Sequence, residues 1–250
     1  MSTRRSRNFL ISLRHSRGDD IKKFIITIDG PAAAGKSSAA KGLAQFYQYA
    51  YLESGSLYRA ISFYLHEKKI DPYCRTLVEQ SCREIHIEIA PETDPFEIWV
   101  NRKNVTPFLR IPEVTQISAV VSTYPIIREQ LLTIQRAIGE KGGVVVEGRD
   151  MGTVVFPHAD MKFYLDADLS VRGARRYNEL HEKDRVINLN EVTHDIAVRD
   201  ASDRERKTAP LKMASDAILI DSTLLSRQEV LRQMIEAIEK WRRNRAEVIE

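Results

Sequence analysis

The chain has 250 residues, of which 43% are hydrophobic and 29% are charged, a balance typical of a globular protein of one domain or one domain with an insertion. The formal net charge is +3, but residues 1–23 contribute +5 and the remainder carries −2, so the charge does not indicate a nucleic-acid-binding protein. Two cysteines are too few for a disulfide framework, and no apolar run approaches the roughly 20 residues that span a bilayer. We therefore expect a cytoplasmic protein with reduced thiols and with neither a membrane nor a nucleic acid as partner.

Residues 1–22 are a basic, Ser-rich tail that contains a short apolar patch between Phe9 and Leu13. Three interpretations remain open: a disordered tail or an upstream start codon, an organelle transit peptide, and a basic docking arm. We favour the first, because composition alone does not establish a targeting signal. The patch is too short and too broken for a secretory signal.

Residues 24–28 are a largely β-branched run without turn residues, which predicts a buried parallel strand. Asp29-Gly30-Pro31 ends this strand, and apolar side chains then recur at helical spacing over residues 37–49. A second helix is expected over residues 56–68, because Asp71-Pro72 would stop it.

From residue 85 to residue 105 the pattern changes to alternating polar and apolar side chains. Alternation over residues 86–89 and 97–100 predicts antiparallel strands with one solvated face. We expect a small inserted subdomain here. The elements expected after it are helices near 113–122 and 125–141, strands at 144–147 and 161–165, helices to about Asp200, an Arg- and Asp-rich segment to Pro210, a strand at 217–220 and a helix at 229–241. Strands that alternate with helices predict a parallel sheet flanked by helices on both faces.

Residues 30–37 match the P-loop pattern G-x4-G-K-S in full. A strand before the pattern and a helix after it are the context that a P-loop requires, because glycine permits the backbone turns that aim N–H groups at phosphate. We expect Lys36 to reach the β- and γ-phosphates of ATP and Ser37 to bind the accompanying Mg²⁺. The expected ATP-binding residues are Gly30, Pro31, Ala32, Ala33, Ala34, Gly35, Lys36, Ser37 and Ser38.

A kinase that acts on an anionic small molecule needs several arginines that converge on two phosphate groups. Arg149 and Asp150 directly follow a predicted strand, and ligands of such folds gather at the carboxyl ends of the strands. A GTPase is not favoured, because no glutamine stands out as a residue that would position water. The candidate arginines, each expected near a strand end or a loop, are Arg59, Arg128, Arg149, Arg199, Arg204 and Arg206.

Several segments together carry a resemblance to one known family, and the most specific of them is Gly148-Arg149-Asp150-Met151-Gly152-Thr153 within residues 148–157. The other segments are residues 28–37, 53–59, 199–206, 209–211 and 220–223. In their order and spacing, from about Lys23 to the C-terminus, they resemble the bacterial-type cytidylate kinases, P-loop enzymes that phosphorylate CMP and dCMP.

The resemblance implies an α/β fold of the nucleoside monophosphate (NMP) kinase type, in which a parallel sheet flanked by helices carries an NMP-binding subdomain with a small antiparallel sheet, and a short lid. The kinase domain would occupy residues 23–250. Its expected parts are a core of residues 23–53, 143–198 and 211–250, an NMP-binding region of about 54–142 with the antiparallel insert at about 84–106, and a lid of about 199–210.

The resemblance also implies a role for each matching residue. The implied CMP-binding residues are Ser54, Tyr58 and Arg59 at the monophosphate, Arg149 at phosphate, Arg128 and Asp150 at the cytosine, and Arg199 and Asp203 on the ribose side. The implied catalytic residues are Lys36, Arg149, Arg204 and Arg206, of which Arg206 matches a lid arginine over the transferred phosphate.

The chain departs from the family pattern at three positions. Glu53 stands where aspartate is common, and Ala119, with Ser118 beside it, stands where a serine often precedes the cytosine-reading arginine by nine positions. Ser202 replaces an arginine that is often present in the lid, so Arg204 and Arg206 would carry the lid charge.

The resulting hypothesis is ATP- and Mg²⁺-dependent phosphorylation of CMP and dCMP in pyrimidine nucleotide metabolism, by a protein that is a monomer, as is the default in this family. One alternative is a kinase of another small acceptor, such as UMP/CMP, AMP or dephospho-coenzyme A. The other is a non-catalytic nucleotide-binding regulator, which is disfavoured because a sensor would not need a second phosphate site.

Overall fold

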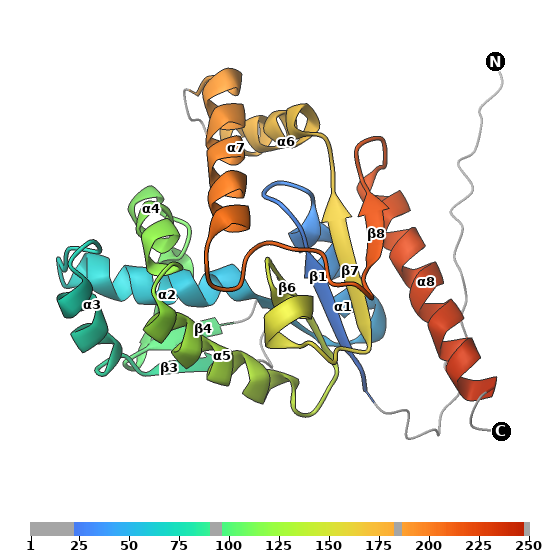
Figure 1. The fold of residues 1–250 in the computed structure, drawn as a ribbon, viewed down its shortest axis with the longest axis horizontal. Coiled ribbons are helices and arrows are strands. Elements are labelled where there is room, and N and C mark those ends of the chain that lie inside the picture. Colours follow the sequence, from blue (N-terminus) through green and yellow to red (C-terminus); the bar gives the residue numbers. More distant parts are fainter. Residues whose placement is uncertain (1–22, 91–96, 183–186, 248–250) are drawn as a thin grey trace, which may run out of the picture.

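The computed structural model describes residues 23–90, 97–182 and 187–247, so the predictions for the tail at residues 1–22 lie outside the described residues. A five-stranded parallel sheet with the strand order β2-β6-β1-β7-β8 forms the centre and confirms the expected α/β fold (Figure 1). Its strands are β1 (Ile25–Asp29), β2 (Ala50–Glu53), β6 (Val144–Gly148), β7 (Met161–Asp166) and β8 (Ile218–Asp221).

The apolar run that predicted a buried strand forms β1, between β6 and β7. Ile26 and Ile28 of this strand have no exposed surface. Helices α1 (Lys36–Tyr47) and α8 (Arg227–Glu247) pack on one face of the sheet, whereas the one-turn π-helix η2 (Met151–Val155) and helix α5 (Pro125–Gly139) pack on the other (Figure 1). Both faces are therefore covered, as the sequence predicted.

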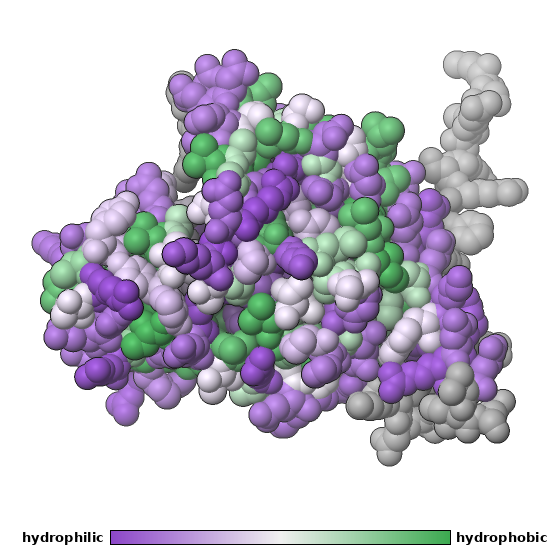
Figure 2. Space-filling model, viewed as in Figure 1, coloured by the Kyte–Doolittle hydropathy of each residue, from purple (hydrophilic) through white to green (hydrophobic). Residues whose placement is uncertain are grey.

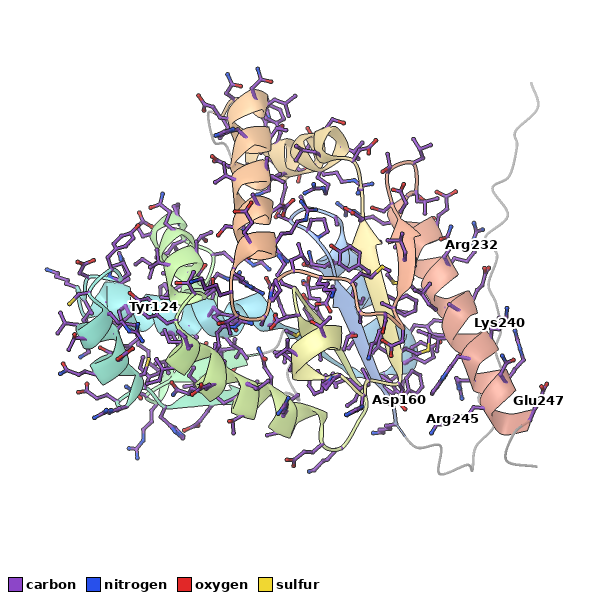
Figure 3. The ribbon with its side chains drawn as sticks, viewed as in Figure 1. Tyr124, Asp160, Arg232, Lys240, Arg245 and Glu247 are labelled. Carbon is purple, nitrogen blue, oxygen red and sulfur yellow. The ribbon has the colours of Figure 1, made fainter. Side chains whose placement is uncertain are left out.

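A second cluster of elements has a hydrophobic core of its own and includes the small antiparallel sheet that the sequence predicted. It consists of α2 (Ser54–Glu67), α3 (Arg75–Cys82), α4 (Pro112–Val121), the 3-10 helix η1 (Thr106–Phe108) and a three-stranded antiparallel sheet of β3 (Ile87–Ala90), β4 (Glu97–Val100) and β5 (Lys103–Asn104). Residues Leu57, Ile61 and Leu65 line the inner face of α2 without exposed surface. The Tyr124 hydroxyl, labelled in Figure 3, donates a hydrogen bond to the Pro72 carbonyl at 2.9 Å and so ties α5 to the turn before α3.

Helices α6 (Leu169–His181) and α7 (Leu189–Glu205) stand above the carboxyl edge of the central sheet (Figure 1). The sequence predicted that helix would end near Asp200, but α7 continues five residues further, to Glu205. The reason is that no residue between Asp200 and Arg206 breaks a helix, and Arg206 is the first with extended backbone (ψ 138°).

Five of the described elements were not predicted from the sequence: β2, α3, β5, η1 and η2. β2 is only four residues long and α3 only eight, so neither has the length over which periodicity becomes clear. The segment at residues 148–153 was expected to be a loop, but residues from Met151 on form η2. The short π-helix leaves the backbone N–H groups of Met151 and Gly152 directed at a side chain, Asp29, rather than at the preceding turn.

Strand β8 is the edge of the sheet and is much more exposed than the apolar run at residues 217–220 suggests. Ile218 is 40% exposed and Leu219 is 56% exposed, and Leu224 in the following loop is 93% exposed. Hydrophobic side chains accordingly gather over β8 and the loop after it on the face shown in Figure 2.

The C-terminal helix is fastened to the amino edge of the sheet by Asp160, which precedes β7 (Figure 3). This carboxylate accepts a hydrogen bond from the Ile25 backbone N–H at 3.0 Å and lies 3.4 Å from the Arg245 guanidinium. Arg232 and Lys240 point outward from the same helix (Figure 3).

We expect Leu43→Ala to lower the free energy of unfolding by about 2–5 kcal/mol, because Leu43 has no exposed surface and its loss leaves a cavity between α1 and the sheet. The same change at Leu224, which is 93% exposed, should stay within about 0.5 kcal/mol. Urea unfolding of both variants measures this difference, and equal losses would contradict the packing described.

Candidate functional site

The P-loop connects β1 to α1 in the conformation that its glycines were expected to provide. Gly30 has a φ of 146° and Gly35 a φ of 97°, both in the range that favours glycine. A Cβ atom on Gly30 would lie 2.0 Å from the Leu165 carbonyl oxygen, so no other residue fits there. The loop thus lies directly against the end of β7, at the carboxyl edge of the sheet.

Lys36 is the buried cation of this loop. Its side chain is 5% exposed, and Nζ donates a hydrogen bond to the Pro31 carbonyl at 2.6 Å. Burial, and then the neighbouring guanidinium of Arg149, lower the pKa of Lys36 to about 7, against the opposing effect of the Glu147 carboxylate. An ammonium group in this position gains more from a bound phosphate than an exposed lysine does.

Two buried carboxylates lie at the ends of the strands beside the P-loop. Asp29 ends β1 and accepts hydrogen bonds from the backbone N–H groups of Met151 at 2.9 Å and Gly152 at 2.7 Å, and burial raises its pKa to about 6. Glu147 lies near the end of β6 and accepts a hydrogen bond from the Tyr51 hydroxyl at 2.8 Å. Asp29 therefore fixes the segment that follows Asp150 to the strand that precedes the P-loop.

A second cationic cluster lies at the start of α2. Glu53 pairs with Arg59 at 2.5 Å and with Arg110 at 2.6 Å. Burial alone would raise the pKa of Glu53, but the two guanidinium groups lower it. The Nε atom of Arg59 is buried and has no hydrogen-bond partner among the described residues, so one strong donor is left over for a ligand.

Arg128 and Asp150 form an ion pair in which both side chains are under 10% exposed. The Arg128 guanidinium lies 5.6 Å from the centroid of the Tyr58 ring, and burial raises the pKa of Tyr58 to about 12. Ser54, also buried, lies so close to Gly148 that a Cβ atom there would be 2.5 Å from the serine Oγ. These side chains form a buried, polar cluster with a donor and an acceptor side by side.

Residues of α7 and the turn after it form ion pairs with Arg149 and Asp150. Asp203 pairs with Arg149 at 2.7 Å and more loosely with Arg206 at 3.4 Å, while Arg206 also lies 3.5 Å from Asp150. Arg199 makes no ion pair with any residue that the structure describes. Although Arg199 is exposed, desolvation by the surrounding protein and then the neighbouring Arg149 lower its pKa to about 10. Strongly hydrophilic side chains gather over the lower half of α7 in Figure 2.

The structure thus brings nearly all the predicted arginines to one region. Arg59 lies in α2, Arg128 in α5 and Arg199 in α7, within helices that the sequence predicted. Arg204 was expected in the segment after the last of these helices, but it lies in α7, because that helix continues to Glu205. Arg204 is exposed, makes no ion pair among the described residues and lies near Tyr164.

Ser118 does not replace the serine that is missing at Ala119. Ser118 is 6% exposed on the inner face of α4, and its hydroxyl donates a hydrogen bond to the Thr115 carbonyl at 2.8 Å. Ala119 is exposed, and Arg128 Nη1 instead donates to the Ser122 carbonyl at 3.3 Å.

Four residues of this region were not singled out from the sequence: Asp29, Arg110, Glu147 and Arg172. Asp29 and Glu147 each stand directly before a glycine at the end of an apolar strand, and that signal was available. Arg110 and Arg172 meet their partners only through the fold, so no local pattern marks them.

No group of three or more His, Cys, Asp or Glu side chains that could hold a metal ion exists among residues 23–90, 97–182 and 187–247. A cation at the P-loop would need phosphate oxygens as ligands in addition to the Ser37 hydroxyl and the Glu147 carboxylate. Both of these side chains interact with the Tyr51 hydroxyl. That donor set of hydroxyl and carboxylate suits Mg²⁺ carried by a nucleotide. In the same described ranges, no helix is both long and apolar enough to cross a membrane.

Comparison with known proteins agrees with this geometry. A family model described as "Cytidylate kinase" matches residues 26–240. The cytidylate kinase of Syntrophotalea carbinolica is 37% identical over 217 residues, which cover 87% of this chain and 92% of the relative. Those of Bacillus subtilis and Anoxybacillus flavithermus are 38% and 40% identical, over 88% and 84% of this chain and 98% and 93% of the relative.

The pKa of Lys36 leads to a testable pH effect. Without phosphate, Lys36 loses its proton as the pH rises through about 7, and a bound triphosphate would restore the proton. We expect ATP binding at pH 8 to take up more protons in the wild type than in Lys36→Arg, whose guanidinium does not titrate. Calorimetric titrations in buffers of different ionisation enthalpy measure this, and equal uptake by the two proteins would contradict the assignment.

Proposed function

The chain belongs to the cytidylate kinase family, and from this premise we propose that it transfers the γ-phosphoryl group of ATP to CMP and dCMP, forming ADP with CDP or dCDP. The observation that carries the proposal is the buried pair of Arg128 and Asp150, beside Tyr58 and within reach of Arg206. Arg149 connects this pocket to the P-loop, because it pairs with Asp203 and is also an electrostatic neighbour of Lys36.

The pair suits cytosine for a simple chemical reason. The exocyclic amine of cytosine donates, whereas its N3 and O2 atoms accept. Asp150 can accept from the amine while Arg128 donates to the ring, and the charge of each is already balanced by the other. Uracil carries a carbonyl where cytosine carries the amine, so Asp150 would face a second acceptor, and a mismatch of buried polar groups discriminates strongly.

The acceptor phosphate fits the cluster at the start of α2. Arg59 has a buried, unpartnered Nε donor, and Ser54 and Tyr58 lie in the same turns of that helix. Glu53 holds the guanidinium of Arg59 in place without using this donor, since their contact is through Nη2. We assign Ser54, Tyr58 and Arg59 to the monophosphate, and Arg199 and Asp203 to the ribose side.

Phosphoryl transfer needs positioning and charge neutralisation more than a covalent catalyst. Lys36 would leave the Pro31 carbonyl for the β- and γ-phosphates, and Arg149 and Arg206 would neutralise the charge that develops between donor and acceptor. Arg204, exposed near the end of α7, would join them when the lid at about residues 199–210 closes and excludes water. Mg²⁺, held by Ser37 and Glu147 together with the nucleotide, would supply further neutralisation of the phosphates.

The wider setting of the reaction is part of the same proposal. We expect the protein to act as a monomer on free nucleotides in the cytoplasm, without a nucleic acid or a membrane as partner. We further propose that the kinase domain consists of a core, an NMP-binding region at about residues 54–142 and the lid.

The first test is ADP release with CMP, dCMP, UMP and AMP as acceptors. We expect CMP and dCMP to be phosphorylated with a kcat/KM at least about 100-fold above that of UMP or AMP. Lys36→Ala should abolish turnover with every acceptor. Equal rates with UMP and CMP would overturn the assignment of the base pocket, and no acceptor-dependent ADP release at all would favour the regulator.

The second test concerns base selectivity alone. Asp150→Ala should reduce the preference for CMP over UMP to less than about 10-fold, because it removes the acceptor for the amine. Glu129→Ala is the matched control, since this exposed carboxylate lies next to Arg128 in the sequence but makes no hydrogen bond or ion pair with the described residues. A preference that survives in Asp150→Ala would show that another group reads the base.

A further inference from the structure

One peptide unit of the P-loop is held from outside the loop by a buried ion pair. The backbone N–H of Ala32 donates a hydrogen bond to Asp200 Oδ1 at 2.9 Å. The carbonyl of Ala32 accepts one from Arg172 Nη1 at 3.0 Å. The same Arg172 nitrogen pairs with Asp200 Oδ2, and the two residues are 5% and 1% exposed.

Helix α6 holds the loop at a second point. Arg175, three residues after Arg172 and so on the same side of the helix, donates to the Ser222 hydroxyl at 3.0 Å and to the Ser222 carbonyl at 2.6 Å. The Ser222 hydroxyl in turn donates to the Ala34 carbonyl at 3.1 Å. The backbone between these two points is strained, because Ala33 has a φ of 59°.

These contacts decide which groups of the loop can meet a phosphate. The Ala32 N–H is turned to a carboxylate and is not available to an anion, although residue 32 lies inside the P-loop pattern. The negative charge of Asp200 does not repel the triphosphate at close range, because Arg172 neutralises it within the protein.

We propose that Arg172 and Asp200 are positioning residues that brace the P-loop against the lid helix and so hold it in its ATP-binding shape. This inference rests on the proposed function. Asp200 belongs to α7, where it lies one residue after Arg199 and three before Asp203. The helical turn that carries Arg199 and Asp203 is therefore tied to the P-loop through Asp200.

The test compares the dissociation constants for ATP and for CMP, each measured alone on the full chain. Asp200→Asn keeps an oxygen for the Ala32 N–H but leaves Arg172 buried without its counter-charge. It should weaken ATP binding at least tenfold and change CMP binding by less than threefold. Arg172→Lys keeps the positive charge but cannot reproduce the three hydrogen bonds of the guanidinium. It should also weaken ATP binding more than CMP binding, but by less than Asp200→Asn does.

The control is Asp195→Asn, an exposed carboxylate on α7 without a described partner, which should leave both constants unchanged. The double variant Asp200→Asn/Arg172→Met should bind ATP more tightly than the separately measured effects of Asp200→Asn and Arg172→Met combined predict, because it removes both charges together. Thermal melting separates a structural role from a positioning role. A lower melting temperature with an unchanged ATP constant in both single variants would overturn the brace.

This outcome is separate from failure of the proposed function. If the wild type binds ATP but releases no ADP with CMP, the kinase assignment fails while the ATP constants still test the brace. If the wild type is an active CMP kinase and Asp200→Asn binds ATP normally, the brace alone is wrong.

Discussion

Pairing of guanidinium groups with carboxylates at the carboxyl edge of the central sheet is the interaction on which the site depends. Each buried arginine there has a matching acid: Arg59 has Glu53, Arg128 has Asp150, Arg149 has Asp203, and Arg172 has Asp200. An unpaired buried charge would cost several kcal/mol, so these pairs allow many cations to be held close together before any phosphate arrives. The site is therefore preformed rather than assembled by its ligands.

The pairs also divide the region into two halves that face each other. Lys36 and the P-loop form the half suited to a triphosphate, and Arg59, Arg128 and Asp150 form the half suited to a second nucleotide. Arg149 belongs to both, because its ion pair with Asp203 joins the lid helix to the strand that ends beside the P-loop. Asp29 adds a rigid connection, since it holds the backbone that follows Asp150. Donor and acceptor are thus positioned by one connected network.

Local patterns in the sequence predicted one half of this site better than the other. The P-loop is a continuous segment of eight residues, so its pattern and the two neighbouring segments were enough to predict a strand, a phosphate-binding loop and a helix. Arg149 and Asp150 could be placed because they follow a buried strand. The end of the helix expected near Asp200 was misplaced by five residues, because the Arg- and Asp-rich segment that follows contains no residue that breaks a helix before Arg206.

Contacts between distant residues could not be predicted in this way. Arg172 and Asp200 are 28 residues apart, and Arg110 and Glu53 are 57 apart. Only the packing of α6 on α7, and of α4 on α2, brings them together. Ser118 shows the same limit. The sequence identified it as the serine beside Ala119, but it could not predict that Ser118 lies on the buried face of α4.

The central claim is that the P-loop and the Arg128–Asp150 pocket are two nucleotide sites close enough for direct transfer. The most direct measurement is the affinity for adenosine and cytidine joined through five phosphates, which would occupy both sites at once. We predict that this compound binds at least about 1,000-fold more tightly than ATP or CMP alone, and far more tightly than its uridine counterpart. An affinity no better than that of ATP would contradict the account, because it would mean that the two sites cannot be occupied together by one linked ligand.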